Sequence, residues 1–421
     1  MSKVTIMIHD LLLILVFFLF QGAAPVSGSN EIPERISTSL QEGSDLLLEV
    51  QEGSGGAEWP YEGVYRVRAS SGDPKALVRG RSAIPIGYRV GGTGICAQAM
   101  FQAPGFADHP ERVEAVGKAI DFVCLSIKDP RMSAADYEGG YDVRGWGYIY
   151  GLRMLLAAHK AGVVSESRAS KVDETIRWFI DALDTIEIPR IGGWNYARQG
   201  DADQSSPTSP FMTAPALIAL FDARAQGFDV DPEMVERALD GLKRCVAPDG
   251  YVAYSAGRQT ANNPGQIPGA IGRMVSAESA LFLAGRSDHT RLSEAVEDFF
   301  EHWKELEKRR KKNGTHDPPY GVAPYYFFYG FNCCSEAIEL LPETARESAR
   351  KRLHDILFQV RETDGSWNDR VFKRSRAFGT AMTMNALQKQ WLPAPVAWPE
   401  STVKKVTPDV APDPDPAESS P

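Results

Sequence analysis

Apolar residues recur along the chain with helical spacing, in two kinds of segment that alternate. The first kind is short and rich in Ala, Leu, Met and Gly, and it falls at residues 92–102, 147–161, 211–225, 273–284, 325–341 and 378–390. The second kind is amphipathic, and it falls at residues 112–126, 167–183, 231–245, 291–307 and 344–360. Alternating β-branched residues are scarce, so the pattern predicts an all-α protein.

A turn that carries Gly or Asp together with an aromatic residue precedes the less polar segments. Six such turns lie at residues 58–63, 139–146, 192–196, 249–251, 316–326 and 364–367. They are separated by tens of residues, near the period of helix-pair repeats. One helix pair cannot bury both of its faces, whereas a closed ring of pairs can. We therefore predict a ring of about six helix pairs over residues 56–391, with the less polar helices inside.

Two of these turns resemble the glycine–tryptophan turns of the squalene/terpenoid cyclase and protein prenyltransferase repeat family. The sequence DGSW at 364–367 leads to FGTAM at 378–382, and GGW at 192–194 leads to FMTAPAL at 211–217. The resemblance spans about residues 56–391 and implies an α/α toroid. A second kind of helical ring, the α/α barrel of carbohydrate-active enzymes, also uses Gly and aromatic residues at its turns.

Both ends of the chain differ in composition from this repeat region. Residues 1–28 carry Lys3, an apolar run at 11–20 and then small residues, as a signal peptide does. We expect export, with an uncleaved membrane anchor as the alternative, and no membrane span in the mature chain. Residues 29–55 are polar and are expected to be a flexible leader. Residues 392–421 are acidic and rich in Pro, which predicts a disordered tail.

Charge and cysteine content narrow the possible partners. The net charge of −9 argues against a nucleic-acid partner, because phosphate binding needs clustered cations. The basic run at 308–312 is expected to be a solvated helix end. Five cysteines in so long an exported chain do not form a disulfide framework, so we expect them to pack in the core.

The catalytic signatures of known toroid families do not accompany the resemblance. No DxDD cluster, the acid of the cyclases, occurs in the sequence. The spacing of the Asp, Cys and His ligands that hold zinc in prenyltransferases is not reproduced, nor is the Gly-Cys-Gly-Glu-Gln motif of thioester domains. We therefore expect no cofactor and no metal, and the sequence leaves open whether the chain is an enzyme.

Aromatic residues at the turns are the remaining candidates for ligand binding. Because the turns enter the inner helices, we expect these residues to gather at one mouth of the ring. They are Trp59, Tyr141, Trp146, Trp194, Tyr196, Tyr325, Tyr326 and Trp367. Such rings suit stacking on a sugar or a cation–π cavity. For Trp194 and Trp367 the alternative is a structural staple between neighbouring repeats.

Four polar residues are candidates for catalysis: Asp142, Glu278, His316 and Asp317. Glu278 interrupts an apolar helix, so it should face the cavity or a buried partner such as Arg273. His316 and Asp317 could form an acid–base pair, or belong to a polar loop.

Two hypotheses about the function follow from these candidates. The first is an exported scaffold that binds a small molecule, a glycan or a protein at the ring mouth. The second is an enzyme acting on a polyisoprenoid or a polysaccharide through facing carboxylates, roughly 5–10 Å apart.

Overall fold

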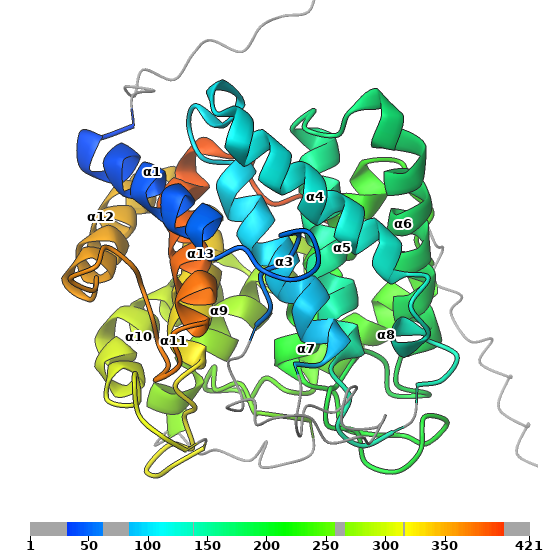
Figure 1. Ribbon diagram of the computed structural model, residues 1–421. Coiled ribbons are helices and arrows are strands. Elements are labelled where there is room, and N and C mark those ends of the chain that lie inside the picture. The colour runs from blue at the N-terminus through cyan, green and yellow to red at the C-terminus, as the bar shows by residue number, and fades with distance from the viewer. Residues whose placement is uncertain (1–31, 62–83, 138, 257–265, 315, 400–421) are drawn as a thin grey trace, which may run out of the picture. The chain divides into compact units, whose positions relative to one another are not determined.

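The computed structural model describes residues 32–61, 84–137, 139–256, 266–314 and 316–399, and these residues form helices and loops without a strand. The helices all belong to one compact unit, Pro33–Pro421 (Figure 1). The preceding unit, Met1–Ile32, holds the expected signal peptide, which lies outside the described residues, as do residues 400–421 of the expected tail. Among the described helices, none is both long and apolar enough to cross a membrane.

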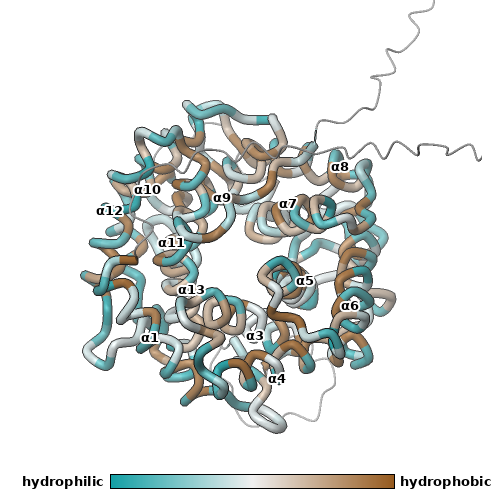
Figure 2. Tube along the Cα trace, turned by 90° about the horizontal axis from the view of Figure 1, so that it is seen from above, coloured by the Kyte–Doolittle hydropathy of each residue, from teal (hydrophilic) through white to brown (hydrophobic). Residues whose placement is uncertain are grey.

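Six inner helices of the described part of the chain form a closed ring (Figure 2). They are α3 (Ile86–Phe101), α5 (Arg144–Lys160), α7 (Pro210–Ala225), α9 (Ile267–Leu283), α11 (Tyr326–Ile338) and α13 (Ser375–Gln388). Each packs against the next, and α13 packs against α3. The outer helices are α4 (Pro110–Ser126), α6 (Glu166–Thr185), α8 (Pro232–Lys243), α10 (His289–Glu307), α12 (Glu343–Gln359) and α1 (Glu34–Glu49). The predicted α/α toroid of six helix pairs is confirmed.

The two helix layers bury their side chains as the hydrophobic pattern predicts. Inner helices are buried almost all round; α11, for example, has no exposed residue over Tyr326–Ile338. Outer helices bury one stripe, which in α6 includes Val172, Ile176, Phe179 and Leu183 at helical spacing. The core is therefore the annulus between the layers, and the ring's inner surface is left for the polar and aromatic residues described below.

Helix α1 corrects the expectation of a flexible leader at residues 29–55. Its Leu40 and Leu47 are fully buried, and the helix packs against α13, α3 and α4. Without α1 the last inner helix, α13, would lack an outer partner. The first and the last α-helix of the described chain therefore form the sixth pair. The sequence signal was the apolar stripe of Ile36, Leu40 and Leu47, spaced by four and seven residues within a polar segment.

Three connections from an outer to an inner helix share one hydrogen-bonded turn. The indole Nε1–H of each turn's tryptophan donates to a leucine carbonyl of the preceding outer helix: Trp59 to Leu47 at 2.7 Å, Trp194 to Leu183 at 2.8 Å and Trp367 to Leu357 at 2.7 Å. The amide of each tryptophan donates to a threonine hydroxyl of the next inner helix: Thr93 at 2.9 Å, Thr213 at 2.9 Å and Thr380 at 3.1 Å. One tryptophan thus ties an outer helix to the next inner helix, through its indole and its main-chain amide, which explains why a Thr follows each of these turns.

Glycines bring α3 and α5 unusually close together. A Cβ at Gly94 would lie 2.5 Å from the carbonyl oxygen of Tyr150, closer than two such atoms can approach. We expect Gly94→Ala to force the helices apart and to lower the free energy of unfolding by about 1–3 kcal/mol, measured by urea denaturation. Gly117→Ala is the matched control, because its Cβ would meet only the flexible Arg168 side chain at 3.3 Å. Equal stability of the two variants would contradict the close approach.

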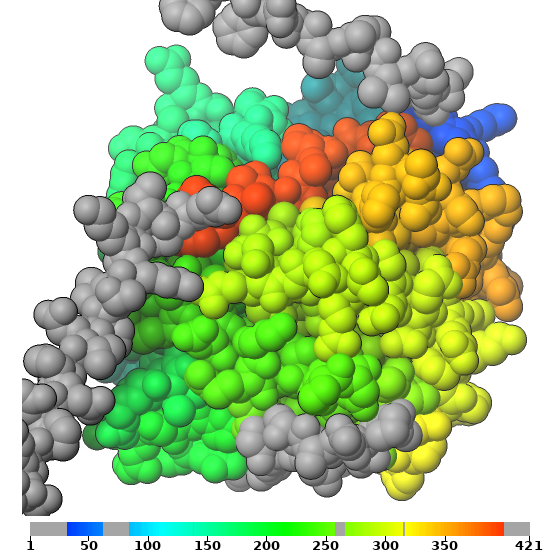
Figure 3. Space-filling model, turned by 180° about the vertical axis from the view of Figure 1, so that it is seen from behind, coloured from blue at the N-terminus to red at the C-terminus, as the bar shows by residue number. Residues whose placement is uncertain are grey.

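The C-terminal segment is ordered further than the composition predicts. Residues 392–399, expected to be the start of a disordered tail, lie on the surface of the ring, seen in red in Figure 3. Trp398 anchors the segment: its ring lies 5.3 Å from that of Phe221, and its amide donates to the carbonyl oxygen of Leu283 at 2.8 Å. Trp398 therefore helps to hold this proline-containing stretch against the ring.

Candidate functional site

The N-terminal ends of the inner helices surround a cavity of about 270 Å³. Its described lining consists of Tyr61, Tyr88, Tyr141, Val143, Trp146, Tyr196, Ala197, Phe211, Tyr254, His316, Tyr325, Tyr326, Tyr329 and Phe378. Eight of these residues are tyrosines, and none is Asp or Glu. We call this space the tyrosine cavity.

The first turns of the inner helices supply much of this wall. Tyr88, Trp146, Phe211, Tyr326 and Phe378 lie in the first turn of α3, α5, α7, α11 and α13. The inner helices run parallel to one another along the axis of the ring, so their first turns meet at the same end. Five lining residues were not predicted from the sequence: Tyr88, Phe211, Tyr254, Tyr329 and Phe378. The signal that could have found most of them is this recurring aromatic residue just after each turn.

Aromatic rings in the wall pack mainly against one another. Tyr61 stacks on Trp146, with ring centroids 5.2 Å apart and planes inclined by 27°. Phe211 stacks on Tyr326 at 4.5 Å and 13°. Such contacts fix the rings in place at little cost in conformational entropy, since few torsions remain free. The cavity is therefore preformed, with rigid flat faces.

Tyrosine hydroxyls form short chains around the cavity. The hydroxyls of Tyr88 and Tyr141 are 3.0 Å apart, those of Tyr196 and Tyr254 are in contact, and Tyr326 donates to Tyr254 at 3.3 Å. Burial raises the pKa of Tyr88, Tyr196 and Tyr326 well above the usual value, because the phenolate would be poorly solvated. These phenols stay neutral at physiological pH and offer both donors and acceptors to a ligand.

Two arginines lie close to the rings of the wall. The guanidinium carbon of Arg273 lies 5.7 Å from the ring of Phe211 and 5.8 Å from that of Tyr254, and Arg273 also donates to two main-chain carbonyls. The guanidinium carbon of Arg370 lies 5.9 Å from the ring of Tyr325. With these cations nearby and no carboxylate among the described lining residues, the cavity does not favour a cationic ligand.

Five of the eight aromatic candidates line the tyrosine cavity: Tyr141, Trp146, Tyr196, Tyr325 and Tyr326. The other three, Trp59, Trp194 and Trp367, are almost completely buried between helix layers and do not line it. The placement of Trp194 and Trp367 agrees with the interpretation of these two residues as structural staples, whereas that of Trp59 corrects its expected place at the mouth. The physical reason is the paired hydrogen bonds of the tryptophan turn, which hold each indole inside its own repeat.

Asp142 and Glu278, two of the catalytic candidates, are buried away from the cavity. Asp142 forms an ion pair with Arg144 at 2.6 Å, and Arg144 is itself almost fully buried. Glu278 accepts a hydrogen bond from Ser287 at 2.5 Å, and Arg273, its expected partner, donates to main-chain carbonyls instead. Both carboxylates therefore serve the structure around them, and neither is among the described residues that line the tyrosine cavity.

His316 and Asp317 point to different partners. The imidazole of His316 lies on the cavity wall, 3.5 Å from the hydroxyl of Tyr325 and 3.0 Å from the carbonyl oxygen of Gly321. Asp317 forms an ion pair with Arg309 outside the cavity lining. Of the two interpretations, the acid–base pair is therefore not formed, and His316 belongs to the polar edge of the tyrosine cavity.

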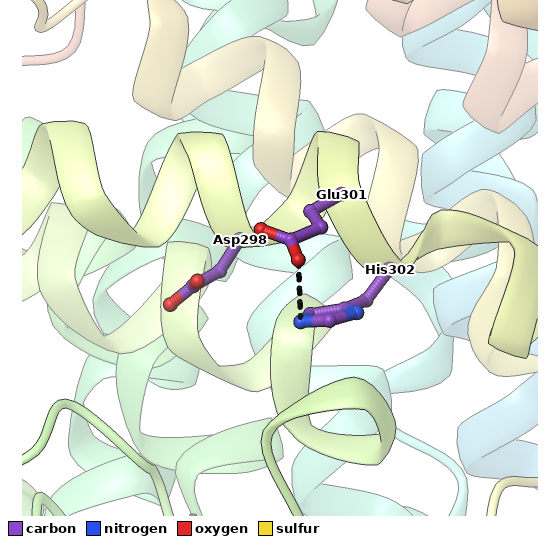
Figure 4. Close-up of side chains that lie close together, drawn as sticks. All are labelled: Asp298, Glu301 and His302. Atoms are coloured by element: carbon purple, nitrogen blue, oxygen red, sulfur yellow. Dashed lines mark ion pairs between the residues drawn. The ribbon is translucent and has the colours of Figure 1, made fainter.

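A single group of described residues has the ligand types and spacing of a metal site. Asp298, Glu301 and His302 lie on one face of the outer helix α10 (Figure 4), and their potential ligand atoms lie within 4.8 Å of one another. Glu301 is exposed and approaches His302 only at 4.0 Å. The group lies on an outer helix, apart from the residues of the tyrosine cavity.

No family model matches the chain, and no curated protein matches it in sequence. Solved structures with a similar course of the chain do exist. The GH76A α-1,6-mannanase of Salegentibacter sp. HEL1_6 superposes with a TM-score of 0.51 at 10% identity, covering 85% of this chain and 100% of the mannanase. The type II terpene cyclase MstE from Scytonema superposes with a TM-score of 0.46 at 14% identity, covering 85% of this chain and 98% of the cyclase.

The mannanase is an α/α toroid, so its superposition agrees with the ring observed here. At such low identity it establishes the fold alone. The class of protein defined by the fold and the cavity is an α/α toroid with a tyrosine-lined pocket at the N-terminal ends of its inner helices.

Proposed function

We propose that the protein is an exported binding scaffold whose tyrosine cavity holds a neutral ligand with a flat apolar face and hydroxyl groups. One observation carries the proposal: the described wall is built of aromatic rings and neutral phenols, with no carboxylate. Flat rings suit the C–H face of a sugar or an unsaturated hydrocarbon, and the hydroxyls suit polar groups at its edge. Export rests on the signal-peptide pattern of residues 1–28.

The chemistry of the wall favours binding over hydrolysis or cyclisation. Glycoside hydrolysis uses two carboxyl groups that flank the bond, and the candidates Asp142 and Glu278 are committed to other partners. A variant of the Salegentibacter mannanase with two neighbouring aspartates replaced is inactive. No two aspartates are adjacent anywhere in the present sequence. Among the described residues, this cavity therefore offers no carboxylic acid to an enzyme that acts on a polysaccharide or a polyisoprenoid.

Trp146→Ala tests the site directly. We expect the native protein to bind a neutral probe, α-1,6-mannotriose or farnesol, and the variant to bind it at least about tenfold more weakly, because truncating a cavity ring removes roughly 1.5–3 kcal/mol of apolar burial. Fluorescence titration measures the affinity, and native mass spectrometry identifies any small molecule that co-purifies.

Trp178→Ala is the matched control, because Trp178 is partly buried but lies outside the cavity, against Tyr148. Its affinity for the probe should equal that of the native protein. Turnover of either probe by the native protein would show that the protein is an enzyme and not a binding scaffold. If neither probe binds and no small molecule co-purifies, the proposed binding site is wrong.

A further inference from the structure

A second cavity of about 330 Å³ lies at the other end of the ring. The C-terminal halves of α3, α5, α7 and α11 line it, together with Lys389 after α13 and residues 392–396 of the C-terminal segment. On α11, Tyr329 lines the tyrosine cavity and Glu336 lines the second one, two helical turns further on, about 10 Å along the axis. The two cavities are thus stacked along the ring.

A buried ion cluster forms the floor of this second cavity. Glu336 accepts hydrogen bonds from Arg153 and, at 3.3 Å, from Lys389, both on its Oε1 atom. Arg153 comes from α5 and Glu336 from α11, which are opposite one another in the six-membered ring. The pair therefore crosses the centre of the ring, between the two cavities.

The cluster has an excess of positive charge. Arg153 and Lys389, each at least 85% buried, share the single carboxylate of Glu336. At the rim, the positive charge of Lys160 is balanced by Asp222, whose Oδ1 atom lies 3.9 Å from the Nζ atom of the lysine. The cations hold the pKa of Glu336 below its usual value despite its burial, so the carboxylate stays ionised. Three cations thus face two carboxylates, and both buried cations retain unused N–H groups.

The rest of the wall is apolar. It consists of Phe101, Ala157, Ala161, Ile218, Ala219, Leu392, Pro393, Ala394, Pro395 and Val396, beside the amides of Gln98 and Gln102. An inorganic anion would pair with the cations but would leave the space between these apolar side chains empty. An uncharged hydrocarbon would fill the space but leave the excess charge unpaired, which is costly in a partly dry site.

We propose that this second cavity binds an amphiphilic organic anion, with its carboxylate on Arg153 and Lys389 and its hydrocarbon body against the C-terminal segment. The site is separate from the tyrosine cavity, so the proposal does not depend on the ligand proposed for that cavity. Octanoate is a suitable probe, because it has one carboxylate and an unbranched apolar body. Octanol has the body without the charge, and acetate has the charge without the body.

Calorimetric titration of the full chain at fixed ionic strength tests the proposal. Octanoate is expected to bind at least about tenfold more tightly than octanol or acetate, since charge-assisted hydrogen bonds and apolar burial each contribute. Lys389→Gln should weaken octanoate binding about tenfold. Glu336→Gln should strengthen it by a similar factor, because the internal carboxylate no longer competes for the same donors.

Weaker binding by Lys389→Gln together with stronger binding by Glu336→Gln cannot arise from a general loss of structure, because such a loss would weaken binding in both variants. Lys389 lies outside the inner helices, in the short turn Lys389–Trp391, so its variant remains informative if Glu336→Gln fails to fold. Trp146→Ala reports on the tyrosine cavity and should leave octanoate binding unchanged. Octanoate binding that is lost in Trp146→Ala, that is unaffected by Lys389→Gln, or that is no tighter than octanol binding would overturn the proposal.

Discussion

Trp194→Ala is expected to lower the free energy of unfolding by about 3–5 kcal/mol, the usual cost of removing a buried tryptophan. The indole is fully buried, and its loss leaves a cavity between α6 and α7. It also removes the donor to the carbonyl oxygen of Leu183, although that carbonyl is near the helix end and can recruit water. Urea denaturation followed by circular dichroism measures the change.

Trp146→Ala is the matched control for this prediction. Trp146 also carries an indole, but it lies on the inner helix α5 and faces the tyrosine cavity, so its truncation enlarges an existing space. It should cost clearly less stability than Trp194→Ala while weakening ligand binding at least about tenfold. The two tryptophans are then distinguished as staple and ligand contact. If Trp146→Ala were the more destabilising of the two, this division of roles would be wrong.

The ring could be predicted from the sequence because its two layers have different hydrophobic patterns. A helix that is apolar on all sides, followed by an amphipathic helix, can bury its apolar surface in few ways other than by packing against other helices. The pattern failed at α1, where a single stripe of three apolar residues lies in a segment rich in Glu and Ser. Composition favoured disorder there, and the tertiary contacts with α13, α3 and α4 stabilise the helix.

The candidate site could be predicted only in part, for a geometric reason. Aromatic residues at the turns were recognisable, but whether a ring points into the cavity or into its own repeat depends on its hydrogen bonds. Trp194 and Tyr196 are two residues apart, and yet one is a staple and the other lines the cavity. The ion cluster of Arg153, Glu336 and Lys389 was not predicted at all, because its members come from distant parts of the chain and meet only when the ring closes.

Asp369 has the most unfavourable surroundings of the carboxyl groups near the tyrosine cavity. Its side chain is fully buried, and neither of its oxygens accepts a hydrogen bond of good geometry. Burial raises the pKa of Asp369 to about 7, although Arg370 and nearby main-chain amides offset part of the effect. The negative charge of Asp369 also contributes to the raised pKa of Tyr61 in the cavity wall.

This pKa makes the stability depend on pH in a defined direction. In the unfolded chain the carboxyl group ionises near pH 4, whereas in the folded protein it stays protonated until about pH 7. The folded state therefore holds an extra proton between these values, and the stability contributed by Asp369 falls as the pH rises through that window. Above pH 7 the loss is complete and amounts to as much as about 4 kcal/mol.

Asp369→Asn should abolish this loss, because the amide has the shape of the protonated acid and cannot ionise. We expect the variant to match the native protein near pH 4 and to exceed it in the free energy of unfolding by up to about 4 kcal/mol at pH 8, measured by urea denaturation across the range. Asp142→Asn is the matched control with the opposite sign: it leaves the buried Arg144 without its carboxylate and should cost about 3–5 kcal/mol at pH 8. A native protein and an Asp369→Asn variant whose stabilities run parallel from pH 4 to pH 8 would show that Asp369 is already ionised in the fold, and that Arg370 and the main-chain amides compensate its burial fully.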